Sequence, residues 1–107
     1  MKETILLVDD EQGIRTVMGL SLRDAGYNVI TVASGEEALQ LFAERPIPIV
    51  ITDIRMPGMN GLDAAREILT KDPAARILFL TTFSDQAYIE QAMRLGTKGY
   101  LIKQGVA

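Results

Sequence analysis

Short apolar runs alternate along the chain with segments in which apolar residues recur at helical spacing. Ile14, Val17, Met18 and Leu22 illustrate that spacing, which is typical of an amphipathic helix. The apolar runs have the length of a β-strand and lie at residues 4–8, 27–32, 49–52, 77–80 and 99–102. The pattern therefore predicts a strand followed by a helix, repeated along the chain.

The predicted strands are uniformly apolar instead of alternating with polar residues, which indicates burial on both faces. A parallel sheet covered by helices on both sides has that property. We therefore predict a single α/β domain over residues 1–107, with a doubly wound, five-stranded parallel sheet.

Residues typical of helix ends and turns separate these elements. Ser34 and Glu37 have capping-box spacing, with the Glu37 side chain expected to reach back to the Ser34 amide. Gly26 and Gly96 stand where helices should end, and Asp72-Pro73 should end the helix before them.

Composition narrows the chemistry. The chain has no Cys and no His, which excludes disulfides, thiolate chemistry, a Cys-based zinc site and phosphorylation on its own histidine. A metal site would have to use oxygen ligands, which favours Mg²⁺, Mn²⁺ or Ca²⁺. The net charge is −3 and no Lys/Arg cluster indicates a nucleic-acid surface. With no signal-peptide pattern and no long apolar stretch, we expect a soluble, cytoplasmic protein that does not enter membranes.

Polar residues follow four of the predicted strands: Asp9 and Asp10, Asp53, Thr81 and Lys103. Ligands of open α/β sheets bind beyond the carboxyl ends of the strands, where the strand order reverses. If the strand order is 2-1-3-4-5, the first and third strands flank that point, and the three carboxylates should converge there.

Such carboxylates repel one another unless a cation lies among them. Mg²⁺ binds few protein carboxylates and leaves room for phosphate oxygens. Asp53 could then attack a phosphoryl group as a nucleophile, while Thr81 and Lys103 contact the transferred group. Individually, each residue has an ordinary structural explanation: Asp10 as a helix cap, Thr81 as a strand residue, Lys103 as a solvated lysine. The hypothesis rests on their joint placement at one edge of the sheet.

The motifs at 5–11, 52–61, 80–82 and 99–103 resemble, in this order, the conserved segments of response-regulator receiver domains of bacterial two-component systems. The resemblance implies a flavodoxin-like fold with the strand order 2-1-3-4-5, and phosphorylation of Asp53 by a sensor histidine kinase. It also implies Mg²⁺, with Mn²⁺ as the alternative, held directly by Asp10 and Asp53, mainly through water by Asp9, and by the backbone carbonyl of Arg55.

The resemblance further implies that Thr81 and Lys103 engage the phosphoryl group. Tyr100 would move inward when Thr81 does, coupling the site to the face made by the fourth helix and fifth strand. The chain would then be a signalling module and not an enzyme, apart from self-catalysed phosphotransfer and dephosphorylation. A DNA-binding output domain is expected in a parent protein, since residues 80–104 look similar to receivers with helix-turn-helix outputs.

Three departures from the family pattern stand out. Gln104 follows Lys103 where many receivers have Pro, and Thr82 is bulkier than the small residue common there. The chain ends four residues after Lys103, so we expect a receiver that lacks its fifth helix. Truncation, a natural end and an engineered or hybrid chain remain open. Homodimerisation through the fourth helix and fifth strand, or through the uncovered sheet face, is a further expectation.

Two other functional classes share some of these features. A phosphatase of the haloacid-dehalogenase type also uses a strand-end Asp with Mg²⁺, but it resembles a pattern with a second Asp where this chain has Arg55. An interaction domain that has lost phosphorylation would not need the acidic residues, Thr81 and Lys103. Nucleotide binding is disfavoured because residues 9–13 are not a glycine-rich phosphate loop.

Overall fold

The computed structural model describes residues 2–45, 47–81 and 86–102. Its strands form one parallel sheet in the order β2-β1-β3-β4-β5, as predicted. The strands are β1 (Thr4–Val8), β2 (Asn28–Val32), β3 (Ile49–Asp53), β4 (Arg76–Thr81) and β5 (Gly99–Ile102). The helices are α1 (Gln12–Asp24), α2 (Gly35–Glu44), α3 (Gly61–Lys71) and α4 (Gln86–Arg94).

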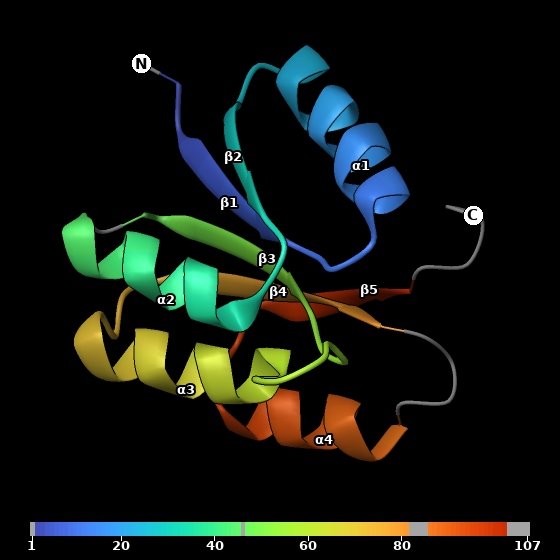
Figure 1. Ribbon diagram of the computed structural model, residues 1–107. Coiled ribbons are helices and arrows are strands. Elements are labelled where there is room, and N and C mark those ends of the chain that lie inside the picture. Colours follow the sequence, from blue (N-terminus) through green and yellow to red (C-terminus); the bar gives the residue numbers. More distant parts are fainter. Residues whose placement is uncertain (1, 46, 82–85, 103–107) are drawn as a thin grey trace.

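Helices cover both faces of the sheet (Figure 1). Helix α1 lies on one face, and α2, α3 and α4 lie on the other. Every strand-to-strand connection in this parallel sheet passes through a helix, which is the doubly wound arrangement expected from the sequence.

The core consists of two apolar layers separated by the sheet. Successive residues of β1 point to opposite faces, so Leu6 and Val8 join the layer beneath α2, α3 and α4, while Ile5 and Leu7 join the layer beneath α1. The two layers explain why the inner strands carry apolar residues at consecutive positions, and they hold the ends of β1 and β3 in fixed positions.

The prediction that the strands are buried on both faces is confirmed for the inner strands β1, β3 and β4. It is wrong for the edge strands β2 and β5. In β5, Tyr100, Leu101 and Ile102 are 42%, 47% and 37% exposed. An edge strand has a neighbour on one side only, and its apolar sequence does not reveal that position. The described part of the chain thus leaves apolar surface on β5.

The start of α2 shows one of the two hydrogen bonds predicted for the Ser34/Glu37 capping box. The Ser34 hydroxyl accepts a hydrogen bond from the Glu37 amide (3.1 Å). The Glu37 carboxylate, however, accepts from the amide of Ala33 (3.2 Å) and not from that of Ser34 as expected. Helix α1 begins after Glu11, so Asp10 is not its cap residue and the structural explanation offered for Asp10 does not apply.

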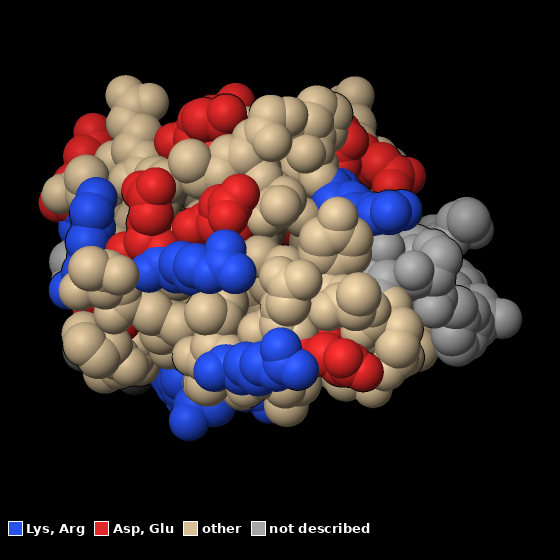
Figure 2. Space-filling model, turned by 90° about the horizontal axis from the view of Figure 1, so that it is seen from below, with Lys and Arg blue, Asp and Glu red and all other residues tan. Residues whose placement is uncertain are grey.

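Charged side chains of both signs are interspersed on the face seen in Figure 2. This agrees with the absence of a basic cluster in the sequence. None of the described helices combines the length and apolar character that crossing a bilayer requires. The predicted loss of a fifth helix, together with Lys103, Gln104 and Thr82, falls outside the described residues.

Candidate functional site

The site lies at the carboxyl ends of the two central strands. Register pairs Val8 of β1 with Thr52 of β3, and the next residues along the two strands are Asp9 and Asp53. Because the strands are parallel and adjacent, both carboxylates come to the same edge of the sheet. This is the convergence that the strand order predicted.

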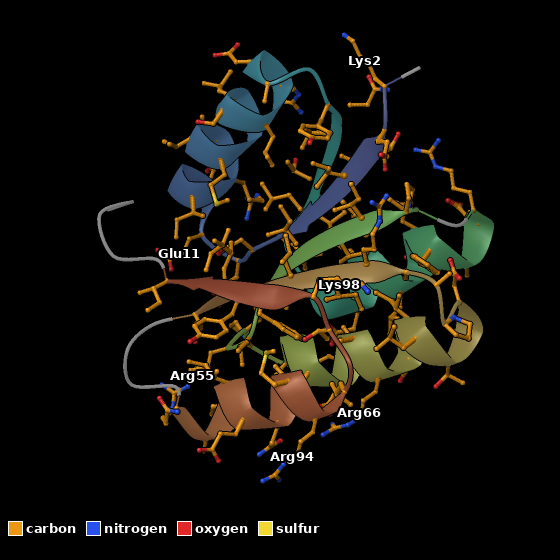
Figure 3. All side chains as sticks on the ribbon, turned by 180° about the vertical axis from the view of Figure 1, so that it is seen from behind. Lys2, Glu11, Arg55, Arg66, Arg94 and Lys98 are labelled. Atoms are coloured by element: carbon orange, nitrogen blue, oxygen red, sulfur yellow. The ribbon has the colours of Figure 1, made fainter. Side chains whose placement is uncertain are left out.

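Four carboxylates gather at this edge: Asp9, Asp10, Glu11 and Asp53 each offer an oxygen, and these oxygens all lie within 4.8 Å of one another. Asp9 is fully buried and Asp53 is 5% exposed, whereas Asp10 and Glu11 are exposed. The site therefore has a buried floor of two carboxylates and a solvent-facing rim of two more. Figure 3 shows Glu11 at this end of the sheet.

Glu11 was not among the predicted ligands. Its position directly after Asp9 and Asp10, in the turn between β1 and α1, was the available signal. A turn can bring three consecutive carboxylates near one point, whereas alternating strand geometry would send neighbouring side chains apart.

The β1–α1 turn is held by hydrogen bonds centred on Asp9. The Asp9 carboxylate accepts from the Glu11 amide (2.9 Å), and its backbone carbonyl accepts from the Arg15 guanidinium (2.6 Å). The Asp9 amide donates to the Val32 carbonyl (3.2 Å), which extends the pairing of β1 with β2 past the strand end. These hydrogen bonds hold the backbone and the carboxylate of Asp9 in place at the floor of the site.

Backbone hydrogen bonds also hold the chain directly after the end of β3. The Ile54 amide donates to the Leu80 carbonyl of β4 (3.1 Å), and the Gly61 amide donates to the Ile54 carbonyl (2.7 Å). A Cβ atom on Gly61 would lie 2.0 Å from the backbone oxygen of Asp53. The start of α3 thus sits directly against the backbone of Asp53, and only glycine leaves room for that approach.

Two of the remaining predicted site residues, Thr81 and Tyr100, lie on the neighbouring strands β4 and β5. Thr81 is the last residue of β4, next to β3, and is fully buried. Tyr100 lies in β5 and is 42% exposed. The guanidinium carbon of Arg55 lies 5.5 Å from the centre of the Tyr88 ring. Lys103 lies outside the described residues.

The loop between β3 and α3 is tied to α2. The Glu36 carboxylate accepts a hydrogen bond from the Met59 amide (3.4 Å), and Gly58 adopts a φ of +77° beside it. An open pocket of about 420 Å³ lies along this loop and reaches α4. It is lined by Arg55, Met56, Pro57, Gly58, Asn60 and Tyr88.

Comparisons with known proteins agree with this geometry. The family model described as "Response regulator receiver domain" matches residues 5–106. This chain belongs to the response-regulator receiver family. A chemotaxis protein CheY of Thermotoga maritima is 36% identical over 104 residues, which cover 96% of this chain and 87% of that protein.

Solved receiver structures share the fold. A response regulator receiver domain protein from Clostridium thermocellum superposes with a TM-score of 0.90 at 36% identity, covering 95% of this chain and 82% of that one. The response regulator TrrA of Thermotoga maritima, solved in complex with Mg²⁺-BeF, gives a TM-score of 0.86 at 37% identity, covering 96% of this chain and 88% of that one.

Other relatives are longer. The probable transcriptional regulator ycf27 of Guillardia theta is 40% identical over 102 residues, which cover 95% of this chain. The chain spans 40% of that regulator and 23% of the transcriptional regulatory protein ZraR of Salmonella typhimurium. The chain therefore corresponds to only part of each of these two proteins.

The acidic cluster of this receiver fits a hard divalent cation. All of its ligands are oxygen atoms, and the two buried carboxylates cannot disperse their charge into water. A cation at the rim would offset the repulsion among the four groups and keep solvent-facing positions for water or phosphate oxygens.

We expect Gly61→Ala to destabilise this receiver by about 3 kcal/mol, because the added Cβ would collide with the Asp53 carbonyl and force backbone movement. Urea unfolding measures the change. Gly13→Ala is the matched control, since its Cβ would meet nothing within 4 Å. That control should be neutral or slightly stabilising. Equal effects of the two substitutions would contradict the close approach at Gly61.

We expect Asp10→Asn to stabilise the cation-free protein by about 1 kcal/mol, because one charge leaves a crowded carboxylate cluster at a solvent-facing position. The same substitution should reduce the extra stability that millimolar Mg²⁺ confers. Thermal unfolding with EDTA and with Mg²⁺ measures both effects, and Glu67→Gln on the exposed surface of α3 is the control. A loss of stability in EDTA would rule out dominant repulsion.

Proposed function

We propose that this receiver is a phosphoacceptor switch in which Asp53 takes a phosphoryl group from the phosphohistidine of a sensor histidine kinase. The observation that carries the proposal is the carboxylate of Asp53 on a nearly buried floor beside Asp9, with Asp10 and Glu11 at the rim. A carboxylate so placed is a nucleophile that a cation can bring close to a phosphate.

In the proposed step, a carboxylate oxygen of Asp53 attacks phosphorus. The new O–P bond forms as the P–N bond of the phosphohistidine breaks, and the imidazole leaves with the bonding electrons. The product is an acyl phosphate on Asp53. Hydrolysis reverses the modification: water attacks phosphorus, the O–P bond to Asp53 breaks, inorganic phosphate is released and the Asp53 carboxylate is regenerated. Both reactions are self-catalysed, and the chain is a signalling module and not an enzyme acting on a separate substrate.

Mg²⁺ is the proposed cofactor, with Mn²⁺ as the alternative, and it would neutralise charge on the transferring group. Asp10 and Asp53 would hold it directly, Asp9 mainly through water, and the Arg55 carbonyl would complete the protein ligands. Glu11 joins this set as a rim carboxylate. The fixed Asp9 turn supports the assignment, because its backbone is already oriented by Arg15.

The proposed switch uses residues on the neighbouring strands. Thr81 would donate its hydroxyl hydrogen to a phosphoryl oxygen, and Lys103 would balance the phosphoryl charge. Tyr100, now half-exposed on β5, would move inward as Thr81 is drawn to the phosphate. The face made by α4 and β5 would thereby change with phosphorylation.

The proposed partners follow from membership of the receiver family. Besides a histidine kinase, a DNA-binding output domain is proposed in a parent protein, because relatives such as ZraR are transcriptional regulators. This domain itself would not bind DNA, and its setting would be the cytoplasm. A homodimer through α4 and β5, or through the adjoining sheet face, is supported by the exposed apolar side chains of Leu101 and Ile102.

We expect incubation with a small-molecule phosphodonor and Mg²⁺ to add the mass of one phosphoryl group. Asp53→Asn should abolish the gain, because an amide oxygen is a poor nucleophile toward phosphorus. Intact-protein mass spectrometry gives the result. Asp24→Asn at the exposed end of α1 is the matched control and should remain phosphorylatable. A folded wild-type protein that gains no mass would refute the proposed function.

We expect sedimentation velocity to show a concentration-dependent dimer that Leu101→Lys weakens, because the charge would have to be buried at the interface. Leu20→Lys is the control, since Leu20 is exposed on α1. A compact monomer throughout the concentration series would exclude the homodimer.

A further inference from the structure

The first turn of α2 contacts the β3–α3 loop, residues 54–60, although it supplies no ligand to the proposed cation site. The Glu36 carboxylate accepts a hydrogen bond from the amide of Met59 (3.4 Å), 23 residues further along the chain. Met59 also lies against Gly35, since a Cβ atom on Gly35 would be 3.2 Å from the Met59 carbonyl oxygen and 3.3 Å from its Cγ. Two consecutive residues of α2 therefore contact the same residue of the loop. Figure 1 shows this loop beside the start of α2.

Gly58 gives the loop the conformation that this contact requires. Its φ of +77° lies in the left-handed region, which glycine adopts without steric cost. A Cβ atom at this position would also lie only 2.9 Å from Oε2 of Glu36. The glycine therefore leaves room for the Glu36 carboxylate beside the Met59 amide.

Arg55 lies between two points at which the loop is held. At the base of the loop, the Ile54 carbonyl accepts a hydrogen bond from the Gly61 amide (2.7 Å), and further along Glu36 holds Met59. Fixing the backbone at both points removes conformations in which the Arg55 carbonyl would point elsewhere. Residues that orient a metal ligand without touching the metal commonly change the affinity for the metal.

The connection between β2 and α2 also contacts the other side of the site. The Asp9 amide donates to the Val32 carbonyl (3.2 Å), and the next amide, that of Ala33, donates to the Glu37 carboxylate (3.2 Å). The Glu37 amide in turn donates to the Ser34 hydroxyl (3.1 Å). The start of α2 is therefore held in place relative to the floor of the site, and a contact from α2 to the loop fixes the loop relative to that floor.

We propose that Glu36 is a positioning residue for the cation site: through Met59 it holds the β3–α3 loop in the conformation in which the Arg55 carbonyl serves as a ligand. The inference rests on the proposed function, since it needs a cation bound at this carbonyl. Glu36 itself does not touch the cation. Because coupling between two equilibria is reciprocal, cation binding also strengthens the hydrogen bond between Glu36 and Met59.

Mg²⁺ is the probe, and its affinity for the full chain is measured by calorimetric titration. We expect Glu36→Ala to weaken Mg²⁺ binding about three- to tenfold, because the loop loses one of its two attachments. Glu36→Gln should restore the affinity to within about twofold of the wild type, since an amide oxygen accepts the same hydrogen bond from Met59. Glu44→Ala is the matched control: it removes an exposed carboxylate at the other end of α2 and should leave the affinity unchanged.

Two further measurements separate positioning from a contribution to stability alone. Hydrogen exchange by NMR should show that Mg²⁺ slows exchange of the Met59 amide in the wild type and in Glu36→Gln, but not in Glu36→Ala. Urea unfolding in EDTA gives the stability of each variant without the cation. A residue that only stabilises the fold would lower the stability in EDTA and leave the Mg²⁺ affinity unchanged.

Each outcome of the titration decides one part of the proposal. Weaker binding in Glu36→Ala that Glu36→Gln restores would support positioning through the hydrogen bond. Equal weakening by both substitutions would mean that only the charge of Glu36 matters and would overturn the proposal, as would unchanged affinity in Glu36→Ala. Either result would leave the phosphoacceptor function standing. A folded wild-type protein that binds no Mg²⁺ would overturn both.

Discussion

Repulsion among carboxylates at one edge of the sheet is the constraint on which the rest of the site depends. Four carboxylate oxygens lie within 4.8 Å of one another, and two of them come from residues that are almost completely buried. The fold holds this arrangement because β1 and β3 are adjacent, parallel and packed on both faces. Packing in the two apolar layers offsets the energetic cost of the cluster, and a divalent cation bound there would reduce the repulsion.

The backbone around the cluster is correspondingly rigid. Asp9 is fixed by its own turn and by Arg15, while the end of β3 is fixed by β4 and by the first residue of α3. The two buried carboxylates therefore cannot relieve their repulsion by moving apart. The exposed carboxylates of Asp10 and Glu11 form the rim, and Arg55 and Tyr88 are in contact along the neighbouring pocket.

Most of the architecture could be predicted from the sequence, because strand length, helical spacing and the polar residues after each strand are local signals. They predicted the parallel sheet, and the family resemblance added its strand order, which brings Asp9 and Asp53 together. The signals failed where position depends on distant parts of the chain. Exposure of β5 reflects its place at an edge, and the Arg55–Tyr88 contact joins a loop to a helix that sequence spacing does not relate.

The origin of the ligands on separate strands has a consequence for folding. Asp9, Asp10 and Glu11 follow β1, whereas Asp53 ends β3, and the α1, β2 and α2 elements lie between them along the chain. The ligands therefore meet only after β1 and β3 have paired, which is a non-local contact of the kind that forms slowly. A divalent cation would select chains that have completed that pairing, and it would lengthen the life of the native state against local opening of the sheet edge.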